Sequence, residues 1–266
     1  MWGERLVWLR QKKTPSYNLK DAGVSILMGL GNVAVSIILA AVTWNSFLWA
    51  YSHRLYTIDV NVWTFPLLIL ADDFIFYWFH RLSHRTRIWW AAHVNHHSSI
   101  CYNLSTALRQ SWTDDLAFRW AFWLPLSFLG FDPRWVLLQK ALNLLYQYWI
   151  HTELIDKMPK WFELVFNTPS HHRVHHGSNP EYLDCNYGGI FIFWDKLFRS
   201  FVPERKDIQI RYGLTKNIQT HDLLTVAFHE WFSLVKDLVD SKSPKQALRI
   251  ALSGPELSRP STSQSE

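Results

Sequence analysis

Three short histidine-rich segments decide how this chain folds: HRLSH at residues 80–84, HVNHH at 93–97 and HRVHH at 172–176. Within each segment, histidines recur three or four residues apart, which places their imidazoles on one face of a helix. Ten of the 13 histidines lie between His80 and His176. A single pair would indicate an ordinary surface or capping histidine. Three matched segments predict a metal site, because so many gathered imidazoles would repel one another on protonation if no metal held them.

The candidate ligands exceed what one metal ion needs. They are the histidines of the three segments and the one that precedes the third: His80, His84, His93, His96, His97, His171, His172, His175 and His176. Imidazole binds Zn, Cu, Fe and Ni, so the ligand type does not name the metal. A zinc site uses three or four protein ligands, and a bis-histidine haem needs two. The number therefore favours two five- or six-coordinate centres, and a pair of redox-active irons beside lipid would suit activation of O₂.

The rest of the chain has the composition of a membrane protein. Of its 266 residues, 48% are hydrophobic and 18% are charged, against roughly 25% charged in soluble domains. Apolar residues form four runs, at 22–50, 62–79, 116–131 and 135–150. The first exceeds the ~20 residues that cross a bilayer and lacks the cleavage site of a signal peptide. The third and fourth are joined by Gly-Phe-Asp-Pro, which predicts a helical hairpin.

The predicted fold is an all-α integral membrane protein. About four transmembrane or membrane-embedded helices would lie under a cytosolic, histidine-rich helical cap that holds a dimetal site. The basic N-terminus places that end in the cytoplasm, and each pair of spans returns the chain there. Residues 1–250 would form one domain, and the Ser/Pro-rich residues 251–266 a disordered tail.

Other patterns exclude alternative classes. The net charge of +5 is spread along the chain without nucleic-acid motifs, so we expect juxtamembrane charge and no nucleic-acid partner. The two cysteines, Cys101 and Cys185, form no CxxC pair, so metal ligands would be histidines. The segment GLGNVA at 29–34 matches a dinucleotide-binding pattern, but no strand precedes it. Close helix packing explains its glycines better.

Two charged residues are predicted to act at the site. Asp73 lies seven residues before His80, almost two helical turns, so both face the same way. A carboxylate there could orient a metal-bound imidazole. Arg109 lies between the second and third segments and could hold a lipid phosphate, a carboxylate or a neighbouring aspartate; a snorkelling interfacial arginine is an equal alternative. Weaker candidates are Glu153, Asp184 and Asp195.

Further motifs give the chain a family resemblance. Asp73-Phe74 precedes the first segment, and Asn186-Tyr187-Gly188 and WDKLF at 194–198 follow the last. With these, residues 17–204 resemble the fatty acid hydroxylase/sterol desaturase superfamily of membrane di-iron enzymes. Runs at 97–111, 149–153 and 167–177 are similar to its alkylglycerol monooxygenase group. That group has Glu where this chain has Arg85, and Gly-Thr in place of Arg199-Ser200.

The resemblance implies two iron ions, held by the segment histidines and by His151 at the end of the fourth apolar run. Zinc could replace iron, O₂ would be the oxidant, and tetrahydrobiopterin is a reductant that the resemblance suggests. The sequence carries no haem, flavin or ferredoxin-type motif, so electrons would come from a separate reductase, cytochrome or diffusible reductant.

The function predicted from these features is hydroxylation of a C–H bond in a membrane lipid, whether fatty acyl, sterol or alkyl-ether. The histidines would face the cytoplasm, at a bacterial inner membrane or the endoplasmic reticulum. The alternatives are a lipid desaturase of the same superfamily and a membrane metal-binding protein without catalysis. The sequence leaves the oligomeric state open.

Overall fold

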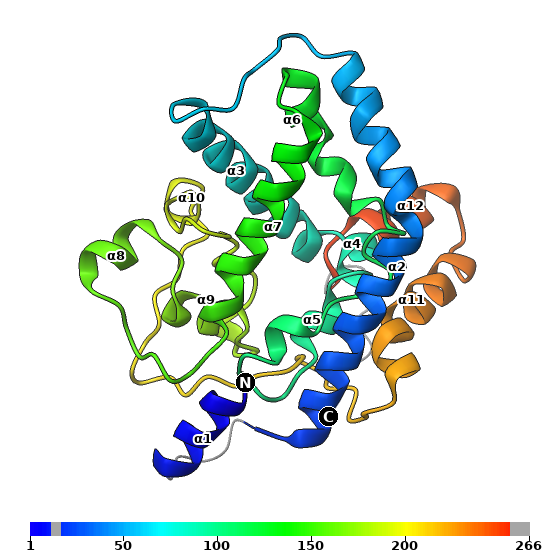
Figure 1. Cartoon of the computed structure of the whole chain (residues 1–266). Coiled ribbons are helices and arrows are strands. Elements are labelled where there is room, and N and C mark those ends of the chain that lie inside the picture. The colour runs from blue at the N-terminus through cyan, green and yellow to red at the C-terminus, as the bar shows by residue number, and fades with distance from the viewer. Residues whose placement is uncertain (12–16, 256–266) are drawn as a thin grey trace.

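The computed structural model describes residues 1–11 and 17–255, which form helices joined by loops (Figure 1). These residues contain no strand, only two isolated β-bridges, so the all-α prediction is confirmed. The helices are α1 (Trp2–Gln11), α2 (Leu19–Ser52), α3 (Thr64–Arg85), α4 (Arg87–Ala91), α5 (Val94–His97), η1 (Thr106–Leu108), η2 (Arg119–Trp123), α6 (Leu124–Leu129), α7 (Pro133–Ile150), α8 (Lys160–Val165), α9 (Pro169–His175), η3 (Pro180–Tyr182), α10 (Phe193–Leu197), α11 (Leu223–Val239) and α12 (Pro244–Leu252).

The longest helix, α2, has two parts with different surroundings. Asn18 caps its start by accepting the backbone N–H of Lys20, as an N-cap residue does. Its 34 residues span about 51 Å, well beyond the ~30 Å core of a bilayer. Near the N-terminal end, residues such as Asp21 and Met28 are buried. Farther along, Ile37 and Ile38 are 69% and 77% exposed, so this part presents an apolar surface suited to lipid.

By length and composition, α2 is the one described helix that could cross a membrane. This supports a membrane protein, but the predicted count of four spans is not confirmed. Helices α3 and α7 have 22 and 18 residues. Neither is long and apolar enough to count as a membrane-spanning helix in the described part of the chain.

The prediction of one continuous helix over 116–131 is wrong. The chain there forms the short 3₁₀ helix η2 and the six-residue α6, which is only about 9 Å long. Phe118 adopts a left-handed conformation just before η2, and Arg119 is buried in an ion pair with Asp114. Pro125 stands in the first turn of α6, where its missing N–H is tolerated, but it cannot continue a preceding helix. The turn into α7 is present, with Asp132 as the N-cap.

The long helices bring their ends to one region. An aromatic core that includes Phe47, Phe76, Trp120 and Trp123 packs α2, α3, η2 and α6 together. From it, α3 and α7 both run toward α5 and α9 (Figure 1). The glycines of the 29–34 segment pack closely, because a Cβ on Gly31 would lie 2.1 Å from the Trp112 ring nitrogen. The packing interpretation of that segment is therefore confirmed.

Helices α11 and α12 pack against α4, and α11 also contacts α2. Helix α12 continues to Leu252, inside the predicted disordered tail; residues 256–266 of that tail lie outside the described residues.

Candidate metal centre

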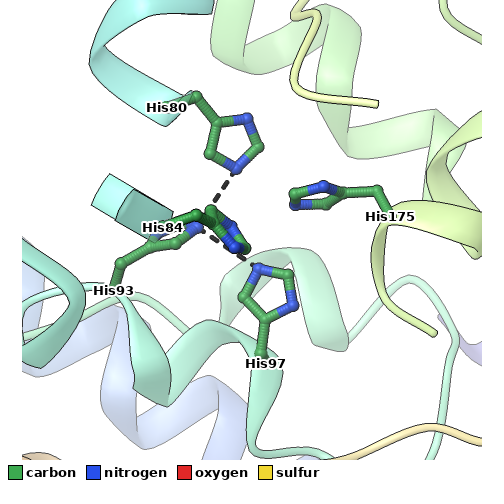
Figure 2. A group of neighbouring side chains, drawn as sticks. All are labelled: His80, His84, His93, His97 and His175. Carbon is green, nitrogen blue, oxygen red and sulfur yellow. Dashed lines mark hydrogen bonds between the residues drawn. The ribbon is translucent and has the colours of Figure 1, made fainter. Parts of the chain in front are cut away.

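Nine histidines gather in two groups where these helices meet. The first group takes two residues from α3, two from the segment around α5 and one from α9 (Figure 2). We call it cluster 1: His80, His84, His93, His97 and His175. One ring nitrogen of each lies within 4.8 Å of the corresponding nitrogens of the others. The sequence-predicted ligands of all three segments thus meet at one point.

The second group takes one residue from α5, one from the C-terminal end of α7 and two from α9 and its C-cap. We call it cluster 2: His96, His151, His172 and His176. Here too the candidate ligand atoms lie within 4.8 Å of one another. His151 belongs to none of the three segments and joins the site because α7 packs against α9.

Adjacent histidines go to different clusters. His96 and His97 are neighbours in the chain, as are His175 and His176, and each pair contributes one member to cluster 1 and one to cluster 2. Successive residues on a helix point about 100° apart, so a pair of adjacent ligands on one short helix can reach two separate centres. Two centres are the arrangement that the number of histidines predicts.

Backbone carbonyls fix the orientation of several rings. Nδ1 of His80 lies 2.9 Å from the carbonyl oxygen of Tyr187, and Nδ1 of His175 lies 2.9 Å from that of Cys185. Nδ1 of His151 lies 2.7 Å from the Gln147 carbonyl. A carbonyl only accepts, so Nδ1 of each ring carries the proton and donates it, and Nε2 is left with a free lone pair. This is how proteins orient imidazoles that bind metals.

The spacing of the Nε2 atoms fits metal coordination. In cluster 1, Nε2 of His93 lies 3.1 Å from that of His80 and 3.3 Å from that of His97. In cluster 2, Nε2 of His151 lies 3.2 Å from that of His96 and 3.0 Å from that of His172. Two nitrogens bound to one ion at about 2.1 Å, at angles between square and tetrahedral, would lie roughly 3.0–3.4 Å apart.

Other ring nitrogens have no partner within the protein. Nε2 of His84, His175 and His176 is buried without a hydrogen bond. Buried polar atoms nearly always have a hydrogen-bond partner. The three nitrogens are therefore candidates to donate their lone pairs to a bound metal ion. A metal ion in each cluster would satisfy them, and the residues present therefore fit two transition-metal ions.

Burial also keeps the rings in the form that binds metal. Desolvation lowers the pKa of every cluster histidine, so the imidazoles stay neutral near pH 7; that of His151 falls to about 4. The others whose pKa is lowered are His80, His84, His93, His96, His97, His172, His175 and His176.

The remaining predicted ligand, His171, does not join either cluster. It precedes His172 on α9, so its ring points about 100° away from that of His172. It instead packs edge-on against Phe201 with 5.4 Å between ring centroids. Although His171 stands four residues before His175, its ring nitrogens belong to neither group of candidate ligand atoms.

Asp73 is buried, and its hydrogen bonds go to a loop and to other side chains rather than to a histidine ring. Its carboxylate accepts the backbone N–H groups of Ile190 and Phe191 at 2.6 and 3.0 Å. A Cβ on Gly189 would lie 2.6 Å from Asp73 Oδ1, so this turn needs glycine. The aspartate fixes the loop that follows Tyr187 rather than a ligand itself, because seven residues bring it to the same side of α3 but two turns away.

Two weaker candidates lie closer to cluster 1. Asp195 accepts the backbone N–H groups of Tyr187 and Gly188, and so holds the peptide whose carbonyl orients His80. Asp184 places a carboxylate oxygen 3.7 Å from Nδ1 of His84. Arg85, which replaces the glutamate of the resembled group, lies 3.5 Å from the same Asp184 carboxylate.

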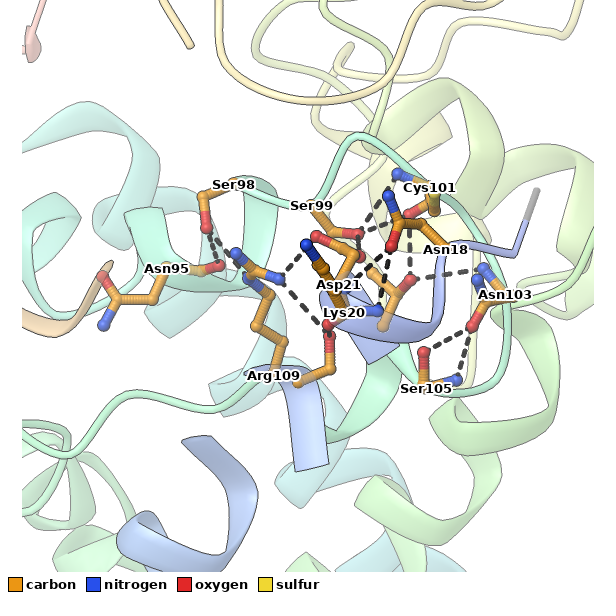
Figure 3. Close-up of polar contacts among 12 residues, drawn as sticks. Asn18, Lys20, Asp21, Asn95, Ser98, Ser99, Cys101, Asn103, Ser105 and Arg109 are labelled. Carbon is orange, nitrogen blue, oxygen red and sulfur yellow. Dashed lines mark hydrogen bonds and ion pairs between the residues drawn. The ribbon is translucent and has the colours of Figure 1, made fainter. Parts of the chain in front are cut away.

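The side chain of Arg109 is also buried, and it points toward α2 and Ser98 (Figure 3). It donates to Asp21 Oδ1 at 2.9 Å and to Ser98 Oγ at 3.0 Å. The sequence predicts a lipid phosphate, a carboxylate or a neighbouring aspartate as the partner of Arg109. In the structure that partner is the aspartate Asp21. Through these two contacts Arg109 links the N-terminal end of α2, at Asp21, to Ser98, the residue that follows the second histidine segment.

Two cavities reach the clusters. One, of about 310 Å³, borders cluster 1 on the side of residues 213–216, and we call it the loop cavity. The other, of about 500 Å³, lies among α2, α3 and α7, borders histidines of both clusters, and is called the helix cavity. The sequence interpretation missed His229, which lines the loop cavity, and Asp115 and Lys140, which line the helix cavity. A charged residue inside an apolar run, as Lys140 is, was the available signal.

Helices with an apolar exterior, a paired set of buried imidazoles and a cavity leading to them define a class: the histidine-rich membrane metalloproteins. Comparison with known proteins narrows it. The fatty acid hydroxylase family matches residues 65–200, about half of the chain and all of the cluster residues. The chain belongs to that family.

Three curated relatives share the name alkylglycerol monooxygenase. The chain is 42% identical to human alkylglycerol monooxygenase over 229 residues, which is 85% of this chain and 50% of that protein. The protein of that name from Danio rerio is 41% identical over 84% of this chain and 49% of its own length. The one from Caenorhabditis elegans is 36% identical over 82% and 43%. The chain spans about half the length of the curated relatives it matches. No solved structure matches it at a significant level.

Proposed function

We propose that this chain is a membrane-bound lipid monooxygenase that places one oxygen atom on a C–H bond of a lipid. The observation that carries the proposal is the juxtaposition of both clusters with the helix cavity, whose lining includes His80, His93 and His96 together with apolar side chains. A reactive centre that opens into an apolar pocket among membrane helices suits a lipid substrate.

Iron in the two clusters would supply the activation of O₂, with electrons from a separate reductase, cytochrome or diffusible reductant such as a tetrahydropterin. The chain's own residues would hold the ions through neutral imidazoles; backbone carbonyls orient three of those rings, and burial of all nine excludes water. The protein positions the carbon and the cofactor does the chemistry. Zinc could occupy the same nitrogens without redox activity.

The names of the relatives favour an alkyl ether of glycerol over a fatty acid or sterol as substrate. The site would face the cytoplasm, where the basic N-terminus is expected, at a bacterial inner membrane or the endoplasmic reticulum. Asp73 and Arg109 would serve as positioning residues, since their side chains bind a loop and the end of α2 rather than a cluster imidazole.

The test is product analysis with isotopically labelled O₂. The full chain is purified in detergent, loaded with iron and a chemical reductant, and incubated with an alkylglycerol, a fatty acid and a sterol. The proposal predicts a product, or its breakdown product, that carries one labelled oxygen, whereas a desaturase would remove two hydrogen atoms and add none. Absence of any product with both clusters loaded would leave a metal-binding protein. His221→Ala, an exposed histidine outside the clusters, is the matched control for His84→Ala.

A further inference from the structure

Charged side chains line the helix cavity beside its aromatic and aliphatic residues. Four of them do so: Asp114, Asp115, Arg119 and Lys140. The cavity also borders the middle of α2, at Ser36, where that helix presents apolar residues outward. Charge at this depth is costly unless something pairs with it, so the partner of each group is informative.

Two of the four neutralise each other. Arg119 forms an ion pair with Asp114, and it also donates to the Ala92 carbonyl at 2.9 Å. The ion pair neutralises both charges, and of the Arg119 guanidinium only Nε is buried without a hydrogen bond to a described residue. Their role is structural, because they hold η2 against the chain that leads to α5.

The other two retain hydrogen-bonding capacity. Asp115 accepts a hydrogen bond from Ser36 Oγ through Oδ2, and its Oδ1 accepts none from a described residue. The ammonium of Lys140 stands 4.5 Å from the centre of the Trp123 ring, yet no described residue accepts a hydrogen bond from it or pairs with it. Lys140 lies at least about two turns from either end of α7, so its ammonium is not at a helix terminus.

The charges of these four side chains indicate which kind of chemical group could bind in the helix cavity. The two carboxylates and two cationic side chains sum to zero, so the lining offers no excess charge to neutralise a phosphate or a carboxylate. An uncharged hydroxyl, however, can accept from the ammonium and donate to the carboxylate. Hydrogen bonds to charged groups are about twice as strong as neutral ones, and the apolar surroundings strengthen them further.

We infer that Lys140 and Asp115 hold an uncharged, hydroxyl-bearing part of the lipid inside the helix cavity, next to the imidazoles that line it. The inference rests on the proposed function for the identity of the ligand as substrate. The two side chains then determine specificity: they select a lipid whose hydroxyls lie close to the carbon that reacts, and they fix which carbon faces the clusters.

The experiment compares two lipids that differ only at the hydroxyls. The probes are a long-chain alkyl ether of glycerol with two free hydroxyls and the same molecule with both hydroxyls replaced by hydrogen, which can neither donate to Asp115 nor accept from Lys140 at those positions. The iron-loaded chain and three variants, Lys140→Met, Lys140→Arg and Asp115→Asn, are assayed with each probe. Lys245→Met, a lysine exposed on α12, is the control.

The wild type should prefer the free diol, and Lys140→Met should raise KM for the diol about tenfold or more while changing little for the probe that lacks both hydroxyls. Asp115→Asn should act in the same direction, Lys140→Arg should keep part of the preference, and Lys245→Met should keep all of it. If Lys140→Met does not fold, the other two variants decide. Unchanged preference in those variants would overturn the inference, as would equal use of both probes by the wild type.

Binding to the metal-free chain separates this inference from the proposed function. The dissociation constant for each probe is measured by equilibrium dialysis in detergent. In one outcome the wild type binds the diol more tightly, Lys140→Met loses that preference, and the iron-loaded wild type oxidises neither probe. The binding role of Lys140 and Asp115 then stands and the oxygenase proposal fails. If oxidation occurs but Lys140→Met and Asp115→Asn bind both probes as the wild type does, that binding role is wrong and the oxygenase proposal stands.

Discussion

The two histidine clusters differ in what orients their rings. In cluster 1, His80 and His175 donate to carbonyls of the loop that contains Tyr187 and Cys185, and His84 faces Asp184. In cluster 2, His151 donates to a carbonyl of its own helix. Nδ1 of His96 and of His172 is buried without a hydrogen-bond partner.

This difference shows that the two clusters depend on different parts of the fold. Cluster 1 is oriented by a loop that follows the last histidine segment and is anchored by Asp73 and Asp195. Cluster 2 depends on the packing of α7 against α9. Changes to the loop should therefore damage the first centre and spare the second, and the predictions below test that separation.

The largest effect should come from removing a single ligand. Alanine at His84, His97 or His176 should abolish lipid oxidation, because each change leaves one ion short of a nitrogen that no neighbour can replace. Product formation is measured against wild type and His221→Ala. Near-normal activity in any one of the three variants would show that its histidine is not a ligand.

Metal content should separate the clusters. The wild type should carry about two ions, one for each group of histidines. His84→Ala should lose the ion of cluster 1 and His151→Ala that of cluster 2, so each variant retains about half the metal. Elemental analysis after dialysis is the measurement. One ion or none in a folded wild-type preparation would contradict the two-centre site, and loss of both ions in each variant would show that the clusters do not load independently.

A loop anchor should have an intermediate effect. Asp73→Asn places an amide donor where two backbone N–H groups now find a carboxylate, so the loop that orients His80 should loosen. We expect metal affinity to fall roughly ten- to hundredfold in cluster 1, the range for residues that support ligands, with little change in cluster 2. The measurement is chelator competition in Asp73→Asn, repeated in the His151→Ala background so that only cluster 1 reports. The exposed Asp207→Asn is the control, and equal weakening of both clusters would refute the separation.

The smallest effect is topological and should leave activity unchanged. Glu181 and Lys206 are exposed in the chain beside the clusters, whereas Asn61 is exposed in the loop between α2 and α3. Cysteines at the first two positions should react with an impermeant probe from one side of the membrane, and a cysteine at Asn61 from the other. The native Cys101 and Cys185 are buried. Labelling of Glu181→Cys and Lys206→Cys from opposite sides would show that the cap is not on a single side.

Local sequence patterns predicted the features that depend on neighbours in the chain. The spacing within HRLSH and HRVHH places histidines on one face of a helix, and the apolar run 22–50 is part of α2 because its side chains suit a helix in lipid. The same kind of reasoning failed at 116–131, where Pro125 and the buried Arg119–Asp114 pair interrupt an apolar stretch. Hydropathy alone does not register such contacts.

By itself, therefore, the sequence determined the ligand type, the number of imidazoles and the helical character of the chain, since these follow from composition and from periodicity over a few residues. Only the tertiary structure decided that His96 and His97 serve different clusters, that His171 serves neither, and that Lys140 and Asp115 meet in one cavity. These outcomes depend on how α2, α3, α7 and α9 pack, and packing joins residues 107 or more positions apart, such as His80 and the Tyr187 carbonyl. No pattern along the chain encodes which distant side chains will share a site, because that is set by the summed contacts of whole helices.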